Sequence, residues 1–422
     1  MSFIVPFFRS TAAIIPSLLL LLLLLHIGIA SLLLPVVEAR LVGAILLPHG
    51  DEALDPTLLP PRTEARSRAR QIAQASHSVG QWMSRQIDPD ILFLTSPHGV
   101  ALSTEFAVYL NDRARGSLHQ VDYQNQSRTV TMDHSILLHP VLGQKLMNGL
   151  TTENVTGIRL PSDGSTMEMP LYWGEIVPLL FLVPARQPPP PPPHDESNAT
   201  TNSRSRNLRT APPPHRPIPT TSFTITTSPL LRRRHLIWTF PQRRYTHAAV
   251  DMVDELLRVG SKLFTFLELH PQRIGVVVSG DLSHTHRSDG PYGYSNTSAP
   301  FDAALAHWAR NPCPHASALL ETARNLQPTA LSCGFAGYVL LHGMLCGART
   351  TPTEATAPSS ATTGTLVQLP HHAKKKNVES ADASKPHRTA AAVPLAQWEG
   401  HVLVNLNATY FGMMAAILKR LE

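Results

Sequence analysis

Three histidines in this sequence each come directly after a short run of apolar residues. The runs cover residues 41–47, 91–95 and 275–279, and they lead into Pro48-His49-Gly50, Ser96-Pro97-His98-Gly99 and Gly280-Asp281-Leu282-Ser283-His284. Runs of this kind are typical of buried strands, and loops after strands commonly carry binding side chains. Imidazole binds transition metals and exchanges protons near neutral pH. The pattern therefore favours a metal or acid/base site built from His49, His98 and His284.

Most of the 21 histidines lack this context. His134, His139, His307 and His315 do not follow an apolar run that ends in Pro, Gly or Ser. We expect each of these four to lie at the surface or to be satisfied by ordinary neighbours.

Helical patterns separate the apolar runs. Residues 63–86 and 248–269 carry apolar side chains at helical spacing, and parallel strands need such crossover segments. We therefore predict an α/β fold with an open, mostly parallel or mixed sheet flanked by helices, and with the three histidines at its carboxyl edge. Residues 335–345 are the last predicted helix, and residues 405–421 close the chain.

Two tracts of biased composition interrupt this pattern. Residues 187–228 contain six consecutive prolines and many Ser, Thr and Arg residues, and residues 348–391 are rich in Thr, Ala, Ser and Pro. Such tracts bury too little apolar surface to fold, so both are predicted to be disordered surface insertions. One α/β domain over residues 40–422, interrupted by these two insertions, is the resulting prediction.

The first 39 residues form a segment of a different kind. Residues 14–37 are apolar, and Val37-Glu38-Ala39 places small residues where a signal peptidase cleaves. The run is also long enough to span a bilayer. Residues 1–39 are therefore either a signal peptide or a membrane anchor, and the protein is expected in the secretory pathway, secreted or membrane-anchored. Five Asn-x-Ser/Thr sequons agree with that route.

Charge and cysteine content exclude other classes. The net charge is +6, but the basic residues are scattered or lie in the biased tracts, so no nucleic-acid partner is expected. Cys313, Cys333 and Cys346 are too few for a disulfide framework. One disulfide and one free thiol are compatible with the number.

Several further blocks accompany the histidine motifs in a fixed order. They are Gly174 with Val177-Pro178-Leu179, Gly290-Pro291-Tyr292-Gly293, Phe301-Asp302 and Tyr410-Phe411-Gly412-Met413-Met414. With the histidine motifs they resemble the LigB-type superfamily of class III extradiol ring-cleavage dioxygenases, which also includes the non-enzymatic Memo proteins. The resemblance covers residues 41–345 apart from the first insertion.

The resemblance implies a non-haem Fe(II) centre. In such a centre two histidines and a carboxylate hold one face of the ion and leave positions for a catechol-type aromatic diol and dioxygen. His49 and His98 match the metal histidines of the family. His284 matches the histidine that acts as acid/base beside the bound oxygen.

The sequence departs from the dioxygenases at the third ligand. Those enzymes carry a glutamate where this chain reads Leu331-Ser332-Cys333-Gly334. Cys333 matches the cysteine of Memo-type relatives, and a His/His/Cys set would favour Zn or Cu(I) over Fe(II). Cys333 could equally be a small buried residue at a helix start, with Asp51 or Asp281 supplying an oxygen ligand.

Two functions therefore remain at this stage. The first is an extradiol-type ring-opening dioxygenase that acts on an aromatic diol with iron. The alternative is a catalytically altered, Memo-like metal-binding or protein-interaction module.

Overall fold

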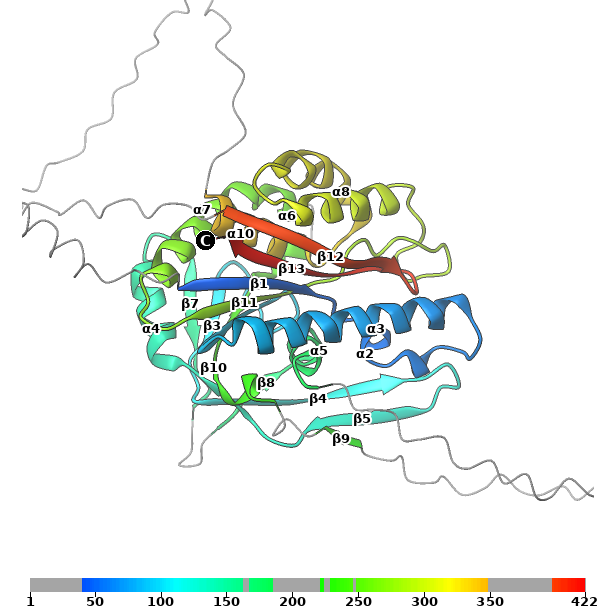
Figure 1. The fold of residues 1–422 in the computed structure, drawn as a ribbon, viewed down its shortest axis with the longest axis horizontal. Helices are drawn as coiled ribbons and strands as arrows, with labels where there is room; N and C mark the ends of the chain where they lie inside the picture. Colours follow the sequence, from blue (N-terminus) through cyan, green and yellow to red (C-terminus); the bar gives the residue numbers. More distant parts are fainter. Residues whose placement is uncertain are drawn as a thin grey trace, which may run out of the picture. The chain divides into compact units, whose positions relative to one another are not determined.

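One mixed sheet carries the secondary structure of the chain (Figure 1). The structure is a computed structural model that describes residues 40–161, 167–184, 221–223, 228–245, 248–347 and 397–421. Within the described residues the sheet has 13 strands, with helices on both faces. The predicted α/β class with an open mixed sheet is confirmed.

The strands follow each other along the chain with several helices between them. They are β1 (Leu41–Leu47), β2 (Ile91–Ser96), β3 (Phe106–Tyr109), β4 (Arg113–Val121), β5 (Ser127–Met132), β6 (Ile136–Leu138), β7 (Val155–Ile158), β8 (Met169–Leu171), β9 (Thr221–Phe223), β10 (Arg234–Thr239), β11 (Ile274–Ser279), β12 (Gln397–Asn407) and β13 (Gly412–Leu421).

The helices include three short 3-10 segments and two π-helical segments. They are α2 (Asp51–Leu54), η1 (Pro56–Leu58), α3 (Glu64–Trp82), η2 (Met83–Ile87), α4 (Pro140–Gly149), α5 (Trp173–Phe181), η4 (Leu230–Arg232), η5 (Gln242–Tyr245), α6 (Ala248–Asp251), α7 (Val253–Glu268), α8 (Ser298–Arg310), η6 (Ala318–Ala323), α9 (Arg324–Ala330) and α10 (Phe335–Cys346).

The middle of the sheet is parallel. Its order there is β1-β11-β2-β10, and each neighbouring pair runs in the same direction. Leu47 pairs with Ser279, and Val278 pairs with Thr95, so these three strands end side by side. The predicted helix over residues 63–86 is α3 with η2, and it provides the crossover between β1 and β2.

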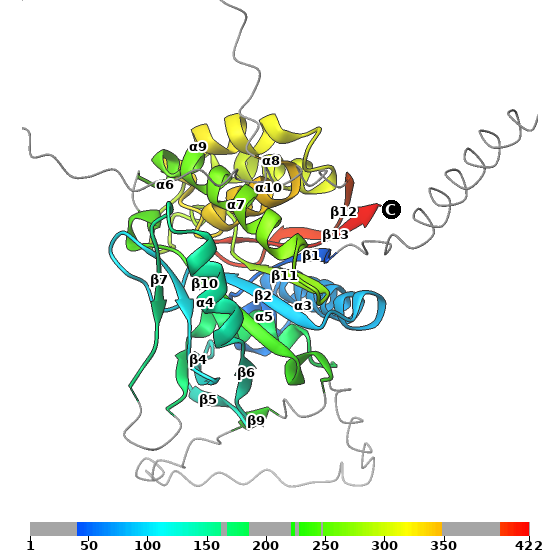
Figure 2. The same cartoon turned by 90° about the vertical axis from the view of Figure 1, so that its left-hand side faces the viewer.

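Helices cover both faces of this parallel centre, because successive residues of a strand point to opposite sides. Ala44 and Leu46 of β1 belong to a core with α7, α8 and α10, whereas Ile45 and Leu47 belong to a core with α3 and α5. Figure 2 shows the two layers on either side of the sheet. Burial on both faces explains why these strands are continuously apolar rather than alternating.

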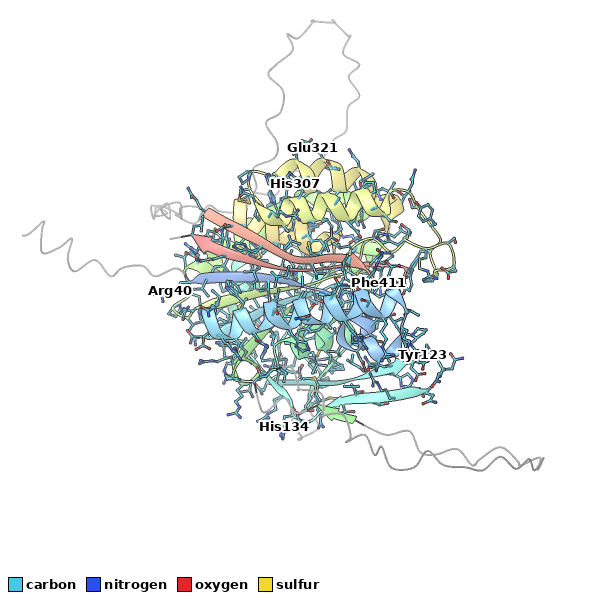
Figure 3. All side chains as sticks on the ribbon, turned by 45° about the vertical axis from the view of Figure 1, so that its right-hand side comes forward. Arg40, Tyr123, His134, His307, Glu321 and Phe411 are labelled. Atoms are coloured by element: carbon cyan, nitrogen blue, oxygen red, sulfur yellow. A yellow bond between two sulfur atoms is a disulfide. The ribbon has the colours of Figure 1, made fainter. Side chains whose placement is uncertain are left out.

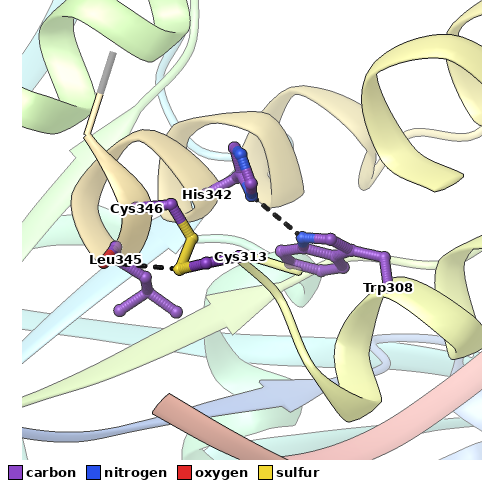
Figure 4. Close-up of a disulfide and its surroundings, with 5 residues drawn as sticks. All are labelled: Trp308, Cys313, His342, Leu345 and Cys346. Atoms are coloured by element: carbon purple, nitrogen blue, oxygen red, sulfur yellow. Dashed lines mark hydrogen bonds between the residues drawn. A yellow bond between two sulfur atoms is a disulfide. The ribbon is translucent and has the colours of Figure 1, made fainter. Parts of the chain in front are cut away.

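Helices α7 and α10 pack very closely on one face. A Cβ atom at Gly260 of α7 would overlap the backbone carbonyl of Leu340 in α10, so only glycine fits there. The C-terminal end of α10 is also tied covalently, because Cys346 forms a disulfide with Cys313 (Figure 4). Cys333 is the free thiol.

The end of the chain forms a hairpin that extends the sheet. Strands β12 and β13 pair antiparallel, and β13 pairs antiparallel with β1. The loop between them carries Tyr410 and Phe411, which places these aromatic side chains near the ends of the parallel strands.

Three predictions from the sequence concern segments that lie wholly or mostly outside the described residues. No helix among the described residues is long and apolar enough to cross a membrane. Residues 1–39, which were predicted to be a signal peptide or a membrane anchor, lie outside the described residues, so the structure gives that prediction no support. The second insertion, residues 348–391, lies outside the described residues. Most of the first does too, but Thr221–Phe223 pairs with β5 as strand β9, so that tract is not wholly without structure.

Candidate metal centre

The ends of three neighbouring parallel strands bring the predicted histidines together. His49 follows β1, His98 follows β2, and Asp281 and His284 follow β11. Cys333 comes from the turn before α10 and reaches the same place. This is the carboxyl edge of the sheet, where open α/β folds bind ligands.

Two histidines and the cysteine form a tight cluster. The possible ligand atoms of His49, His98 and Cys333 all lie within 4.8 Å of one another. His49 Nε2 is 3.3 Å from Cys333 Sγ, and the His49 and His98 rings meet edge to face at 4.7 Å between centroids. The sequence predicted all three residues, and the structure places them in one site.

A hydrogen-bond chain fixes the tautomer of His49. The Ser279 hydroxyl donates its single proton to the carbonyl of Gly174. Toward His49 the same hydroxyl can only accept, so His49 Nδ1–H donates to it across 2.9 Å. The proton therefore resides on Nδ1, and the lone pair of Nε2 points at Cys333. Supporting hydrogen bonds of this kind orient metal-binding histidines.

The position of His98 depends on a glycine. A Cβ atom at Gly174 would come within 2.8 Å of both His98 Cβ and Ser96 Oγ. On its other side the His98 ring packs against Trp173, with 4.8 Å between ring centroids. The start of α5 therefore holds this imidazole against the cluster.

Burial keeps both imidazoles neutral. It lowers the pKa of His49 to about 3, with a further contribution from His284. It also lowers the pKa of His98 to about 2, and His49 and Arg244 add to that effect. Neutral imidazoles have the free lone pairs that metal binding requires.

The acidic groups of the cluster have raised pKa values, and burial is again the main cause. Burial raises the pKa of Asp281 to about 6 and raises the pKa of the Cys333 thiol well above its ordinary value. Burial of an anion without a cation is costly, and a bound metal ion supplies the missing positive charge. The cluster thus has the electrostatics of a cation site.

The donor set fits a single metal ion. Metal–nitrogen bonds of about 2.0 Å and metal–sulfur bonds of about 2.3 Å place two ligand atoms of a tetrahedral ion about 3.3 to 3.8 Å apart. The 3.3 Å separation of His49 Nε2 and Cys333 Sγ is close to the value of about 3.5 Å for a nitrogen and a sulfur ligand. Only small side-chain shifts would bring His98 to the same ion.

A second set of atoms adjoins the first and shares its cysteine. The ligand atoms of Asp281, His284 and Cys333 also lie within 4.8 Å of one another. Asp281 Oδ1 accepts from the His49 backbone N–H at 3.0 Å, while its Oδ2 lies 3.3 Å from His49 Nε2. His284 Nε2 is buried and has no hydrogen-bond partner among the described residues. This nitrogen is therefore an unsatisfied polar atom beside the cluster.

Two cavities reach the cluster from different sides. A cleft of about 690 Å³ is lined by His49, Asp51, Glu52 and aromatic residues of the β12–β13 loop. A second cavity of about 480 Å³ reaches Cys333. His98, Trp173, His284 and Tyr292 line both.

The other candidate ligands and motif residues have different roles. Asp51 lines the cleft, but its side chain accepts a hydrogen bond from Gln120 and is absent from both clusters. Asp302 binds His286 Nε2 at 2.7 Å and accepts from the Ser283 backbone, so it holds the loop that carries His284. Between Asp51 and Asp281, only Asp281 stands where it could bind the metal.

The histidines expected to be incidental lie apart from the cluster. His134 and His307 are exposed and appear at opposite ends of the view in Figure 3, whereas Tyr123 and Phe411 of the cleft lie on one side. His307 stacks on His315 at 3.9 Å, and His139 caps α4 by accepting from Leu142 N–H.

Three site residues were missed by the sequence reasoning. They are Trp173, which packs on His98, and Arg244 and Gln327, which line the second cavity. Trp173 adjoins the Gly174 block and could have been found there. Arg244 and Gln327 lie in segments without a motif, so only the fold reveals them.

Comparison with known proteins identifies no family for this chain. No family model matches it, and no curated protein matches it. Among solved structures, the crystal structure of the uncharacterized protein JW3007 from Escherichia coli K12 is similar, with a TM-score of 0.41 and 12% sequence identity over 89% of this chain and 99% of that chain. A likeness this weak shows neither a family nor a function for this chain.

These comparisons correct the description taken from the motifs. Nothing in them supports the terms dioxygenase, extradiol or aromatic-compound metabolism for this chain. Membership of the LigB-type superfamily stays a resemblance of short blocks, and iron stays an expectation.

Proposed function

We propose that this domain binds a thiophilic metal ion, Zn²⁺ or Cu(I), through His49, His98 and Cys333, and presents it to a small molecule in the adjoining cavities. The observation that carries this proposal is the 3.3 Å approach of Cys333 Sγ to the lone pair of His49 Nε2. Thiolate with two imidazoles is a donor set that selects soft or borderline metals. The bound ion would supply Lewis-acid or one-electron chemistry beside His284.

Metal preference tests the proposal. Apo protein is loaded anaerobically with Zn²⁺, Cu(I) or Fe(II), and affinities are measured for the wild type and for Cys333→Ser. Loss of the thiolate is expected to weaken Zn²⁺ and Cu(I) binding by about 100-fold or more, since even supporting residues contribute 10- to 100-fold. Fe(II) binding should change far less.

A matched control separates the site from general damage. His307→Ala removes an exposed imidazole outside the cluster and should leave all three affinities unchanged. His49→Ala and His98→Ala should each abolish binding while the domain stays folded by circular dichroism, because both residues lie on loops. Equal loss of Fe(II) and Zn²⁺ binding in Cys333→Ser would contradict the proposed preference.

A ring-cleaving dioxygenase is the second candidate, and Asp281 is the observation that favours it. Its Oδ2 lies 3.3 Å from His49 Nε2 and could complete a set of two histidines and one carboxylate. The role for His284 would then be acid/base, for which its unpartnered Nε2 is suited.

Oxygen uptake decides between the two candidates. Protein reconstituted with Fe(II) is mixed with a panel of catechols, and oxygen consumption is followed with an electrode. The dioxygenase predicts catechol-dependent uptake that falls by about 10²- to 10⁴-fold in His284→Ala with the metal retained. No uptake with stoichiometric iron bound would remove this candidate.

A further inference from the structure

A buried carboxyl group lies between the two segments that surround His98. Glu175 of α5 is fully buried, and burial raises the pKa of its carboxyl group to about 7. A carboxylate taken out of water costs free energy unless its oxygens are hydrogen-bonded. Here Oε1 accepts from the Tyr109 hydroxyl at 2.7 Å, and Oε2 accepts from the Tyr172 backbone N–H at 2.8 Å. The metal cluster does not use this group, so its retention needs another reason.

The Tyr109 hydroxyl extends this connection to the loop that carries His98. It accepts the Val100 backbone N–H at 2.7 Å. An N–H can only donate, so the phenol proton is directed to Glu175. The Val100 carbonyl is bound as well, because the Thr239 hydroxyl donates to it at 2.6 Å. Both backbone groups of Val100 are therefore held two residues after His98.

The backbone next to His98 lies in direct contact with the two side chains. A Cβ atom at Gly99 would come within 2.4 Å of Glu175 Oε1 and within 2.6 Å of the Tyr109 hydroxyl oxygen. A residue with a side chain would have to displace one of them, and glycine avoids this. The loop therefore rests on the hydrogen-bonded pair of Tyr109 and Glu175.

The second oxygen of Glu175 is tied to the residues that touch the imidazole. Tyr172 directly precedes Trp173, whose indole packs on the His98 ring. Gly174 follows, and a Cβ atom there would come within 2.8 Å of His98 Cβ. The bond from the Tyr172 N–H to Glu175 Oε2 closes the first turn of α5 around these two residues. One carboxyl group thus connects the support beside His98 with the backbone that carries it.

We propose that Tyr109 and Glu175 are positioning residues for the His98 imidazole, because their hydrogen bonds fix the loop after β2 to the start of α5. Neither side chain touches the metal ion, and each acts through the orientation of His98. The effect on metal binding rests on the proposed function, in which His98 is a ligand. The position of the imidazole can be measured without metal, so failure of one proposal is distinguishable from failure of the other.

Ring-proton NMR of the metal-free full chain measures that position. The His98 and Trp173 rings lie at 31° between planes, so the His98 ring protons should resonate upfield of those of an exposed histidine. The signal is assigned by its absence in His98→Gln. Tyr109→Phe keeps the aromatic ring in the core but removes the hydroxyl, so the signal should move toward the position of an exposed histidine. Zn²⁺ affinity should fall by about 10- to 100-fold, the effect of losing a supporting residue.

Glu175→Gln separates the positioning role from that of an ordinary helix cap. Glutamine serves as well as glutamate in a cap, where its oxygen accepts from the Tyr172 N–H. The amide offers one oxygen in place of two, so either that N–H or the Tyr109 hydroxyl then faces an N–H₂ group. The positioning role predicts a shift of the His98 signal in the same direction as in Tyr109→Phe, whereas a cap predicts no shift.

Ser228→Ala is the matched control, because it removes a buried hydroxyl that donates to the Leu182 carbonyl beyond the far end of α5. It should change neither the His98 signal nor the Zn²⁺ affinity. An unmoved His98 signal in either folded variant, Tyr109→Phe or Glu175→Gln, would overturn the inference, as would an equal shift in Ser228→Ala. A shifted signal with unchanged Zn²⁺ affinity would support the positioning role and contradict His98 as a metal ligand.

Discussion

Ser279 shows how a single hydroxyl can fix the tautomer of a buried histidine. Its proton is committed to the Gly174 carbonyl, and this commitment forces His49 to carry its own proton on Nδ1. The nitrogen that faces Cys333 is then a lone pair without any rearrangement. The chain thus places a neutral imidazole at the cluster with the orientation that the proposed metal site requires.

Ser279→Ala tests this role directly. The variant removes the acceptor for His49 Nδ1–H but none of the ligand atoms. We expect metal affinity to fall by about 10- to 100-fold, the effect of losing a supporting hydrogen bond. Isothermal titration of Zn²⁺ measures it. Ser228→Ala, which removes a buried hydroxyl that donates to the Leu182 carbonyl beyond the far end of α5, is the control, and equal losses in both variants would contradict a specific role for Ser279.

Residue type alone did not reveal the whole site. His49, His98 and His284 could be predicted because each ends a local apolar run, and Cys333 because of its motif. Their mutual distances could not, since they depend on the register of β1, β11 and β2. Asp281, and not Asp51, approaches the cluster because of the conformation of the turn after β11. No pattern in the sequence predicts that conformation.

At the scale of elements, the contact between α8 and α10 contains a titratable group outside the site. Trp308 Nε1–H donates to His342 Nδ1 at 3.1 Å, which requires Nδ1 to be unprotonated (Figure 4). Burial lowers the pKa of His342 to about 4. The folded state therefore opposes protonation of this histidine.

This contact predicts a loss of stability in acid. The unfolded pKa is about 6.5 and the folded pKa is lower, so the contribution of His342 is complete above about pH 6.5 and declines as the pH falls toward 4. At pH 5 the loss attributable to His342 is about 2 kcal/mol. Urea unfolding at pH 7 and pH 5 should show a smaller difference for His342→Gln than for the wild type. An unchanged difference would show that His342 is protonated as easily as a solvent-exposed histidine.

The elements were predictable to different degrees. Helix α3 and strands β1, β2 and β11 follow from local periodicity, because each buries a continuous stripe or face. The pairing of β13 with β1 joins segments from opposite ends of the sequence, and no local pattern specifies it. Strand β9 lies in a tract whose composition indicates disorder, and it forms because β5 offers an edge.

At the scale of the whole molecule, the Cys313–Cys346 disulfide closes a stretch with a sequence separation of 33. Closing a loop of that length restricts the unfolded chain and stabilises the fold by about 2 to 4 kcal/mol. The double variant Cys313→Ser/Cys346→Ser should lose that amount in denaturant unfolding. Metal affinity should not change, because Cys346 and Cys333 lie at opposite ends of α10, which is about 18 Å long at a rise of about 1.5 Å per residue.

Loss of metal together with the disulfide would contradict this separation. It would mean that the disulfide positions the start of α10, and with it Cys333. An unfolding free energy equal to that of the wild type would instead show that the disulfide contributes no stability.

The layered architecture explains why the centre can be rigid. Parallel strands covered on both faces fix the ends of β1, β2 and β11, and α10 begins directly beside them. The cavities lie outside these ends, where loops and the β12–β13 turn can vary without disturbing the core. The three proposed ligand residues lie directly beside the fixed strand ends and the start of α10, which limits how far their side chains can move apart.

X-ray absorption spectroscopy of the metal-loaded protein tests the central claim most directly. One Zn²⁺ per chain should show a single sulfur ligand at about 2.3 Å and nitrogen ligands at about 2.0 Å. The sulfur should disappear in Cys333→Ser, whose weakened site is loaded with excess Zn²⁺. A spectrum of the wild type with oxygen and nitrogen ligands only would contradict the assignment of Cys333 and, with it, the His49, His98 and Cys333 centre.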